Sequence, residues 1–233
     1  CVEDGARVAI SGQALGIAEA AFREARKYAA EREQFKQSID RFPAIYDLLT
    51  RMKMKVVAAR ALLYETTRVV DLRHSYNRLV EHLPADQVTD AMRAKAKEYS
   101  RLAAVLTPMS KAYSTEIANQ VAYDSIQCHG GKGYMREQQV ERLYRDARIM
   151  NIYEGTTQLQ IVAAIGGLVK RVLDPTLDEL AALPFSGGAA ELAMRVAEAR
   201  EVTAACLVFV ESDSSNRLDL AARRLVRMAT LVY

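Results

Sequence analysis

The chain has 233 residues, of which 50% are hydrophobic and 26% are charged, and its formal net charge is +3 at pH 7. A chain of this length can bury one large or two small hydrophobic cores, and its composition is that of an ordinary globular protein. The small net charge excludes a broad surface for nucleic acid or for an anionic membrane. The apolar run from Ile161 to Val169 is too short to span a bilayer and ends at Lys170.

Hydrophobic periodicity predicts four long helices, because apolar residues recur at spacings of three, four or seven and so share one helical face. They cover residues 6–31, 41–74, 95–128 and 156–172. Pro43 lies near the start of the second helix, where proline is tolerated. Pro108 lies inside the third helix and predicts a kink or a break there.

Loops separate the helices where glycine, proline and polar residues gather. They read LPADQ at 83–87, GGKGY at 130–134 and PFSGG at 184–188. The last of these is the most linker-like segment, and two more amphipathic helices follow it, around residues 192–210 and 218–233. No stretch alternates convincingly at period two, so no sheet is expected.

The predicted fold is therefore all-α, because long helices joined by short loops pack most simply as an up-and-down four-helix bundle. We expect the bundle to cover residues 1–172 and an additional helical region to cover 173–233. The last predicted helix reaches Tyr233 without a residue that would end it, which leaves open that the additional helical region is cut short. The chain begins without an initiator methionine, and we expect it to be a piece of a longer protein.

Cysteine and histidine usage predicts neither a disulfide framework nor a metal site. The three cysteines are odd in number and far apart: Cys1, Cys128 and Cys206. This argues for a reducing compartment, and we expect a cytoplasmic protein. The histidines show no metal-ligand spacing: His74, His82 and His129.

Two short motifs could reach a phosphate-bearing ligand. At the end of the first helix, Arg32 offers a planar fork suited to phosphate and Phe35 offers a ring for stacking. Gln127 lies on the last turn of the third helix, before the bare backbone of Gly130 and Gly131. On these residues alone, a solvated helix end and a simple chain reversal are the better interpretations.

Two further motifs lie close together in the sequence. The run RLYRDAR, residues 142–148, reads more readily as a salt-bridged structural knot than as a ligand site. Glu154 lies just before a predicted helix start, where a carboxylate usually serves as a cap. However, Ile152 and Tyr153 precede it, and a carboxylate lined by such groups loses hydration and becomes a better base for proton abstraction.

Taken together and in this order, the four motifs resemble the C-terminal helical domain of the acyl-CoA dehydrogenase family. The resemblance covers about Ala6 to Lys170, and YRDARIMNIYEGTTQLQ, residues 144–160, is its most specific part. Two departures, a longer stretch around residues 74–96 and more than sixty residues after Lys170, resemble a larger bacterial branch that includes 3-methylmercaptopropionyl-CoA dehydrogenase.

The resemblance implies a protein of three domains, of which this chain is the third, a C-terminal four-helix bundle. Family members are flavoproteins of fatty acid metabolism that bind FAD and oxidise an acyl-CoA to the trans-2-enoyl-CoA. A base removes the α-proton, the β-hydrogen leaves as hydride to the flavin, and electrons usually pass to an electron-transferring flavoprotein. Because neighbouring subunits share the flavin site, the resemblance also implies a homo-oligomer, a dimer or a tetramer.

The resemblance assigns roles to individual residues. Glu154 matches the catalytic base, and its own backbone N–H matches one hydrogen-bond donor to the enolate oxygen. The positions that match the acyl and thioester site are Tyr153 and Gly155, and those that match contacts to the same subunit's flavin are Thr156 and Gln158. The positions that match contacts to a neighbouring subunit's flavin are Arg32, Phe35, Gln127 and Gly131.

Some family branches carry the base on the first helix instead, just before an arginine that Arg7 resembles. Here that position is Ala6, which cannot accept a proton, and Glu3 lies nearby but does not align with the position of the base. Two alternatives to a dehydrogenase stay open: an acyl-CoA oxidase, which this domain does not separate from a dehydrogenase, and a non-catalytic helical assembly module. The combination of Glu154, Arg32 and Gln127 argues against the module, because a scaffold needs none of them.

Overall fold

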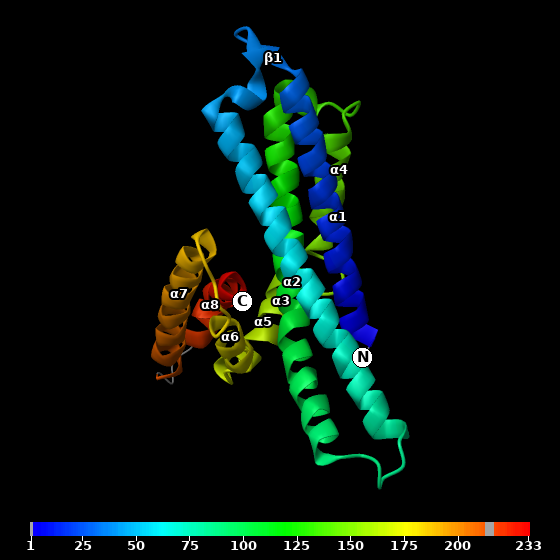
Figure 1. The fold of residues 1–233 in the computed structure, drawn as a ribbon. Coiled ribbons are helices and arrows are strands. Elements are labelled where there is room, and N and C mark those ends of the chain that lie inside the picture. Colours follow the sequence, from blue (N-terminus) through cyan, green and yellow to red (C-terminus); the bar gives the residue numbers. More distant parts are fainter. Residues whose placement is uncertain (1, 213–216) are drawn as a thin grey trace. The chain divides into compact units, whose positions relative to one another are not determined.

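The computed structural model describes residues 2–212 and 217–233, with side chains from residue 5 onward, and the chain is almost entirely helical (Figure 1). In chain order the elements are α1 (Val2–Glu31), β1 (Glu33–Gln34), β2 (Gln37–Ser38), η1 (Ile39–Arg41), α2 (Pro43–His82), α3 (Asp90–His129), η2 (Gly130–Tyr134), α4 (Gln139–Met150), α5 (Thr157–Val169), α6 (Asp174–Ala181), α7 (Gly188–Glu211) and α8 (Arg217–Val232). The prediction of an all-α fold is confirmed, since the strands of the described residues form a single hairpin of two strands with two residues each.

The chain divides into two compact units that do not follow chain order. The first contains the residues up to Glu65 together with 110–157, and the second contains 66–109 together with 158–233. Helices α2 and α3 each contribute to both units, and in α3 the boundary falls between Met109 and Ser110, one residue beyond Pro108. A domain boundary at residue 172 stays a prediction.

The first unit is an up-and-down arrangement of α1, the start of α2, the end of α3, and α4 (Figure 1). Its core contains a stripe of fully buried alanines on α1, at spacings of three and four: Ala14, Ala18, Ala21, Ala25 and Ala29. Small side chains let a neighbouring helix approach closely. Accordingly, the hydroxyl of Ser125 donates to the carbonyl of Ala21 at 2.8 Å, which ties α3 directly to the α1 backbone.

Several helix boundaries differ from the predicted ones. The residues around 74–96 lengthen α2 to His82 and start α3 at Asp90, so the extra length extends this pair of helices rather than forming a domain. Pro108 does not break α3, because it removes a single backbone donor from a helix that is otherwise buried on both sides of it. Helix α4 was not predicted, because charged residues dominate its sequence and hide the apolar face on which the helix packs. The buried residues of that face are Val140, Leu143 and Ala147.

The second unit contains α5 to α8 and the adjoining parts of α2 and α3. Helices α7 and α8 pack through buried aliphatic residues: Leu207, Val210, Leu225, Val226 and Ala229. Arg200 of α7 donates to Asp178 of α6 at 2.7 Å. Helix α5 packs closely on α3 at Gly167, where an added Cβ would overlap Cγ2 of Val105 and lie 3.4 Å from its Cβ.

This close approach generates a stability prediction. Gly167→Ala should lower the free energy of unfolding by about 1–3 kcal/mol, because the β-branched Val105 cannot move aside without strain. The adjacent Gly166→Ala is the matched control, since its Cβ would meet nothing within 4 Å, and it should be neutral or stabilise by up to about 1 kcal/mol. Urea unfolding measures both, and Val105→Ala should rescue Gly167→Ala. Equal effects of the two glycine substitutions would contradict the packing assignment.

Candidate active site

The turn between α4 and α5 carries Glu154 in an unusual backbone conformation. Glu154 has φ of +52° and Gly155 has φ of +90°. Glycine adopts positive φ freely, but for glutamate it costs about 1–2 kcal/mol. The backbone N–H of Thr157 closes the turn on the carbonyl of Asn151 at 3.2 Å. A strained non-glycine residue at this position is a feature that the surrounding structure must hold in place.

A buried lysine holds the turn on both sides of Glu154. Lys111 of α3 is completely buried, and its ammonium donates to the carbonyl of Tyr153 at 2.8 Å and to the carbonyl of Gly155. Burial lowers the pKa of Lys111, the nearby charge of Arg7 lowers it further, and the charge of Glu154 opposes both. The two carbonyls give the buried ammonium the acceptors that it needs.

A carboxylate one turn further along α3 holds the two ends of the same turn. Glu116 accepts from the hydroxyl of Thr157 at 2.8 Å and from the side-chain amide of Asn151 at 3.3 Å. Arg148 of α4 donates to the other side of the Asn151 amide. Helix α3 therefore presents a cation to the middle of the turn and an anion to its ends.

Side chains on either side of the turn attach it to the other helices of the first unit. Asn119 of α3 donates to the carbonyl of Ala147 at 2.9 Å, which fixes the end of α4. The hydroxyl of Tyr153 donates to Gln13 of α1 at 2.7 Å. Burial raises the pKa of Tyr153, and the charge of Glu154 raises it further, so this phenol stays neutral around pH 7.

The expectation that Ile152 and Tyr153 desolvate Glu154 is wrong within this chain. Glu154 is exposed, and Ile152 is itself 42% exposed. The reason is geometric: the turn directs the ring of Tyr153 toward α1 and leaves Ile152 on the surface. Thr156 and Gln158 are also exposed, the latter on the first turn of α5.

The remaining predicted residues gather at the end of the first unit where α1 and α3 both finish. Arg32 directly follows α1, Gln127 lies on the last turn of α3, and both are exposed. The two helix ends are held together by Tyr28 and His129, whose rings stack with their centroids 4.2 Å apart. Within the part of the chain that the structure describes, the guanidinium of Arg32 has no hydrogen bond or ion pair.

Phe35 sits at the tip of the hairpin between β1 and β2 and is 88% exposed. Phe35 and Lys36 form the two-residue loop, and both have positive φ, of +50° and +68°. Such loops usually contain asparagine and glycine, so two bulky residues there store strain. An exposed aromatic ring held out on a strained loop is suited to contact with another molecule.

The glycines of the turn after α3 have different reasons to be glycine. A Cβ on Gly133 would lie 2.7 Å from Cβ of His129 and 2.8 Å from the carbonyl of Ile126, so packing requires it. A Cβ on Gly131 would meet nothing within 4 Å of the described chain. The bare, exposed backbone of Gly131 is therefore open to a group from outside this chain.

The structure does not bring the two sets of predicted residues together. Lys111, which contacts the turn of Glu154, and Gln127 lie sixteen residues apart on α3. At 1.5 Å per residue this places them about 24 Å apart along the helix axis. One chain therefore carries two separate surfaces: the turn of Glu154, and the end formed by Arg32, Phe35, Gln127 and Gly131.

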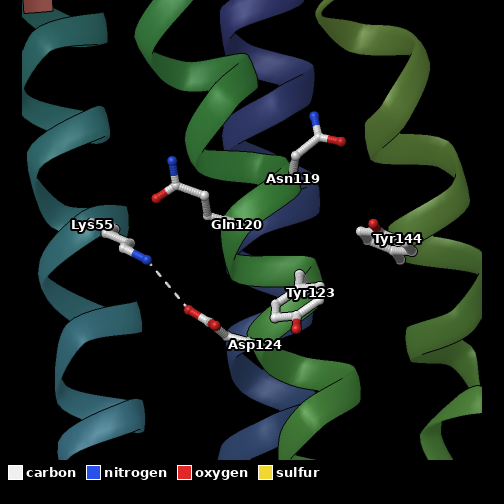
Figure 2. Close-up of a pocket in the computed structure, with 6 residues that line it drawn as sticks. All are labelled: Lys55, Asn119, Gln120, Tyr123, Asp124 and Tyr144. Atoms are coloured by element: carbon white, nitrogen blue, oxygen red, sulfur yellow. Dashed lines mark hydrogen bonds and ion pairs between the residues drawn. The ribbon is translucent and has the colours of Figure 1, made fainter.

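A surface hollow of about 290 Å³ lies elsewhere on the first unit, and Figure 2 shows its lining. It contains none of the predicted residues. Lys55 of α2 and Asp124 of α3 form an ion pair of 3.3 Å at its edge. Tyr123 and Tyr144 meet edge to face with their centroids 6.3 Å apart. The hollow is therefore a groove between helices that is distinct from the turn of Glu154.

Sequence reasoning missed Lys111 and Glu116, although a signal for Lys111 was present. It lies in a run of apolar and small residues, 102–122, whose helical spacing places it on a buried face. A lysine there needs acceptors from another segment. The run 142–148 is not a salt-bridged knot among the described residues: Arg145 pairs with Glu141 outside the run, and Arg148 binds Asn151.

Other expectations can be placed on the described residues. Cys128 and Cys206 are free thiols, and burial raises the pKa of Cys128 to about 11. Cys1 and the side chain of Glu3 lie outside the described residues. Over the same residues, no cluster of three histidine, cysteine or acidic side chains could hold a metal ion. None of the described helices combines the length and the hydrophobicity that crossing a membrane requires.

Comparison with known proteins matches residues 4–165 to the C-terminal domain of acyl-CoA dehydrogenases. Subunit CarC of the caffeyl-CoA reductase-Etf complex from Acetobacterium woodii is 35% identical over 168 residues, which cover 72% of this chain and 37% of CarC. The structure of butyryl-CoA dehydrogenase from Megasphaera elsdenii matches with a TM-score of 0.56 and 32% identity, over 72% of this chain and 37% of that one.

A third similar protein, an acyl-CoA dehydrogenase from Bacillus anthracis complexed with FAD, has a TM-score of 0.72 and 26% identity. Its structure covers 99% of this chain, so the helices beyond the bundle have a counterpart there, and the match uses 40% of that protein. This chain thus spans little more than a third of the relatives that it matches. The chain belongs to the acyl-CoA dehydrogenase family, of which it carries the C-terminal domain.

Proposed function

We propose that this chain is the C-terminal part of a flavin-dependent acyl-CoA dehydrogenase, in which Glu154 is the base that removes the α-proton of an acyl-CoA thioester. The observation that carries the proposal is the strained turn of Glu154, which Lys111 and Glu116 hold from a single helix. A surface carboxylate that merely caps a helix needs neither the strain nor a buried cation beneath it. The fragment alone is expected to be inactive, since most of the acyl pocket lies outside it.

The residues at the far end of the bundle fit FAD. An exposed guanidinium without a partner in the described chain suits a diphosphate, and the exposed ring of Phe35 suits a planar ring. Gln127 adds an amide, and Gly131 allows close approach of its backbone. When bound, FAD supplies the hydride acceptor for the β-hydrogen. Thr156 and Gln158 follow the base in the sequence, and they are proposed to contact the flavin of the same subunit.

The turn itself performs the proton chemistry. The carboxylate of Glu154 accepts the α-proton, and the backbone N–H of Glu154 is proposed to donate a hydrogen bond to the thioester oxygen as it gains negative charge. Tyr153 and Gly155 are proposed to line the acyl and thioester site. Because Glu154 is exposed in this chain, the water that surrounds it has to be displaced by the acyl chain and by the rest of the protein.

The separation of the two surfaces supports an oligomer. A diphosphate bound at Arg32 would lie about 24 Å along α3 from the level of Glu154, and one chain then serves two flavins. We propose that Arg32, Phe35, Gln127 and Gly131 contact the flavin of a neighbouring subunit. A homo-oligomer, dimer or tetramer, is then part of the mechanism.

The electron partner and the direction of the reaction are also proposals. The relative CarC belongs by name to a reductase-Etf complex, which favours an electron-transferring flavoprotein as the partner here. The same name favours a second candidate activity, reduction of an enoyl-CoA, in which Glu154 would deliver the proton instead of removing it. The free thiols of Cys128 and Cys206 fit a reducing, cytoplasmic setting. Formation of peroxide during turnover would instead indicate an acyl-CoA oxidase.

The base assignment predicts the outcome of Glu154→Gln in the full-length protein. This variant keeps the shape of the side chain but cannot take a proton. It should retain flavin and acyl-CoA and lose α,β-dehydrogenation by more than the roughly 10²–10⁴ typical of acid–base groups. Anaerobic loss of flavin absorbance on mixing with saturated acyl-CoAs measures the rate.

Flavin content and binding of acyl-CoA are the controls for this variant. If Glu154→Gln keeps both and is still reduced at a rate near that of wild type, Glu154 is a cap and not the base. A screen of straight, branched and aryl acyl-CoAs in the wild type identifies the substrate class. If none of them reduces a flavin that is tightly bound, a non-catalytic assembly module becomes the better interpretation.

The flavin assignment predicts the outcome of Arg32→Ala. The full-length variant should bind FAD about 10- to 100-fold more weakly, because charge-assisted bonds to a phosphate contribute about 1.5–3 kcal/mol. Arg26→Ala is the matched control, since it removes the same charge from an exposed position on α1, six residues before Arg32. Equilibrium dialysis of FAD measures both. Equal FAD affinity in the two variants would show that Arg32 does not contact the cofactor.

A further inference from the structure

Lys111 determines where the backbone N–H of Glu154 points. The carbonyl of Tyr153 and the N–H of Glu154 belong to one peptide unit, and no peptide bond of the described chain is cis. In a trans peptide these two groups point in opposite directions. Because the carbonyl of Tyr153 accepts a hydrogen bond from the ammonium of Lys111 at 2.8 Å, the N–H of Glu154 is directed away from Lys111.

The second contact of Lys111 attaches the backbone on the C-terminal side of Glu154. The carbonyl of Gly155 also accepts from the ammonium, so the peptide unit that precedes Glu154 and the one that follows Gly155 are both attached to one point on α3. These two attachments restrict the backbone between them, in which Glu154 and Gly155 both have positive φ. A neutral or missing side chain at position 111 would release the turn toward a conformation that is less strained for glutamate.

The position of Lys111 also has an electrostatic consequence. A completely buried ammonium acts across a medium of low polarity, where hydrogen bonds in a chain polarise one another. An ammonium that bonds to the carbonyl of Tyr153 withdraws electrons from that amide and makes the N–H of Glu154 a stronger donor. The effect grows as negative charge develops on the group that this N–H contacts, so it favours a transition state over the ground state.

We propose that Lys111 is a positioning residue for enolate stabilisation: through the peptide between Tyr153 and Glu154, it orients and polarises the N–H of Glu154 that bonds to the thioester oxygen. This inference rests on the proposed function. The turn has a separate anchor in Glu116, which bonds to Asn151 and Thr157, so holding the turn to α3 does not by itself require a second charge. Burying an ammonium costs several kcal/mol, and an electrostatic role explains why a cation occupies this position.

The experiment uses the flavin-loaded full-length protein with a 3-oxoacyl-CoA as the probe. The α-proton of this thioester is acidic, and its loss gives an enolate with negative charge on the thioester oxygen. In a Glu154→Gln background the side chain at 154 cannot hold the proton. The pH at which the bound probe ionises, followed by absorbance, then reports enolate stabilisation independently of the base.

Lys111→Met should raise the ionisation pH of the bound probe by about one to two units, a loss of roughly 10- to 100-fold in enolate stabilisation. This is less than the roughly 10²–10³ that removal of an entire oxyanion donor costs, because the N–H itself remains. With Glu154 intact, Lys111→Met should slow flavin reduction by a similar factor and leave the affinity for saturated acyl-CoA within about threefold, since the effect belongs to the transition state.

Two variants separate this role from packing. Lys111→Arg keeps a cationic donor and should restore most of the lost ionisation. Thr115→Val changes a buried neighbour whose hydroxyl bonds to the carbonyl of Lys111 within α3 at 2.8 Å, and it should leave the ionisation pH unchanged. An unchanged ionisation pH in a Lys111→Met protein that retains flavin would overturn the proposal.

If Lys111→Met does not retain flavin, Lys111→Arg and Lys111→Gln decide the question. A lower ionisation pH in Lys111→Arg than in Lys111→Gln supports the role of the charge, and equal values overturn it. Failure of the proposed function would give a different result. No acyl-CoA would then reduce the flavin of the wild type, and Glu154→Gln would not differ from the wild type in flavin reduction, whatever the ionisation pH in the Lys111 variants.

Discussion

The buried ammonium of Lys111 is the interaction on which the candidate active site depends. It donates hydrogen bonds to the carbonyls of Tyr153 and Gly155, on either side of Glu154. It thereby holds a turn whose positive φ glutamate would not adopt by its own preference. A loop is ordinarily the most mobile part of a helical protein, whereas a catalytic group has to be held to a fraction of an ångström. Attaching the loop by its backbone to a buried segment of α3 combines a loop position with the rigidity of a helix.

The bundle gives that helix its fixed position. Fully buried alanines on α1 allow α3 to pack so closely that Ser125 and Cys128 bond directly to carbonyls of α1. The same helix then ends beside Arg32, so one rigid rod connects the turn of Glu154 with the proposed flavin contacts about 24 Å away. A spacing set by a helix cannot be changed locally, so this helix would keep the two surfaces of one chain matched to two sites in the proposed oligomer.

The sequence predicted the helices well and the site only in part. Long amphipathic stretches identify themselves by period, whereas the roles of Glu154, Gln127 and Arg32 were assigned from family motifs and stay predictions. The residues that hold the turn of Glu154 escaped prediction, because Lys111 and Glu116 lie more than thirty residues before the turn and meet it only through folding. Positive φ at Glu154 also leaves no trace in a single sequence, since the residue type argues against it. The exposure of Glu154 was mispredicted because apolar neighbours in sequence can point away from a side chain.

The first turns of α1 show why a family can carry its base at two places. Arg7 lies near enough to Lys111 to affect its pKa, and Gln13, on the same helix, bonds to Tyr153. The start of α1 therefore runs past the turn of Glu154, so a carboxylate at position 6 would lie on the helix that passes this turn. Alanine at that position cannot accept a proton, which agrees with the proposal that the turn carries the base. The strain at Glu154 and the buried cation beneath it would both follow from the proposed requirement to hold one carboxylate and one N–H against the same ligand.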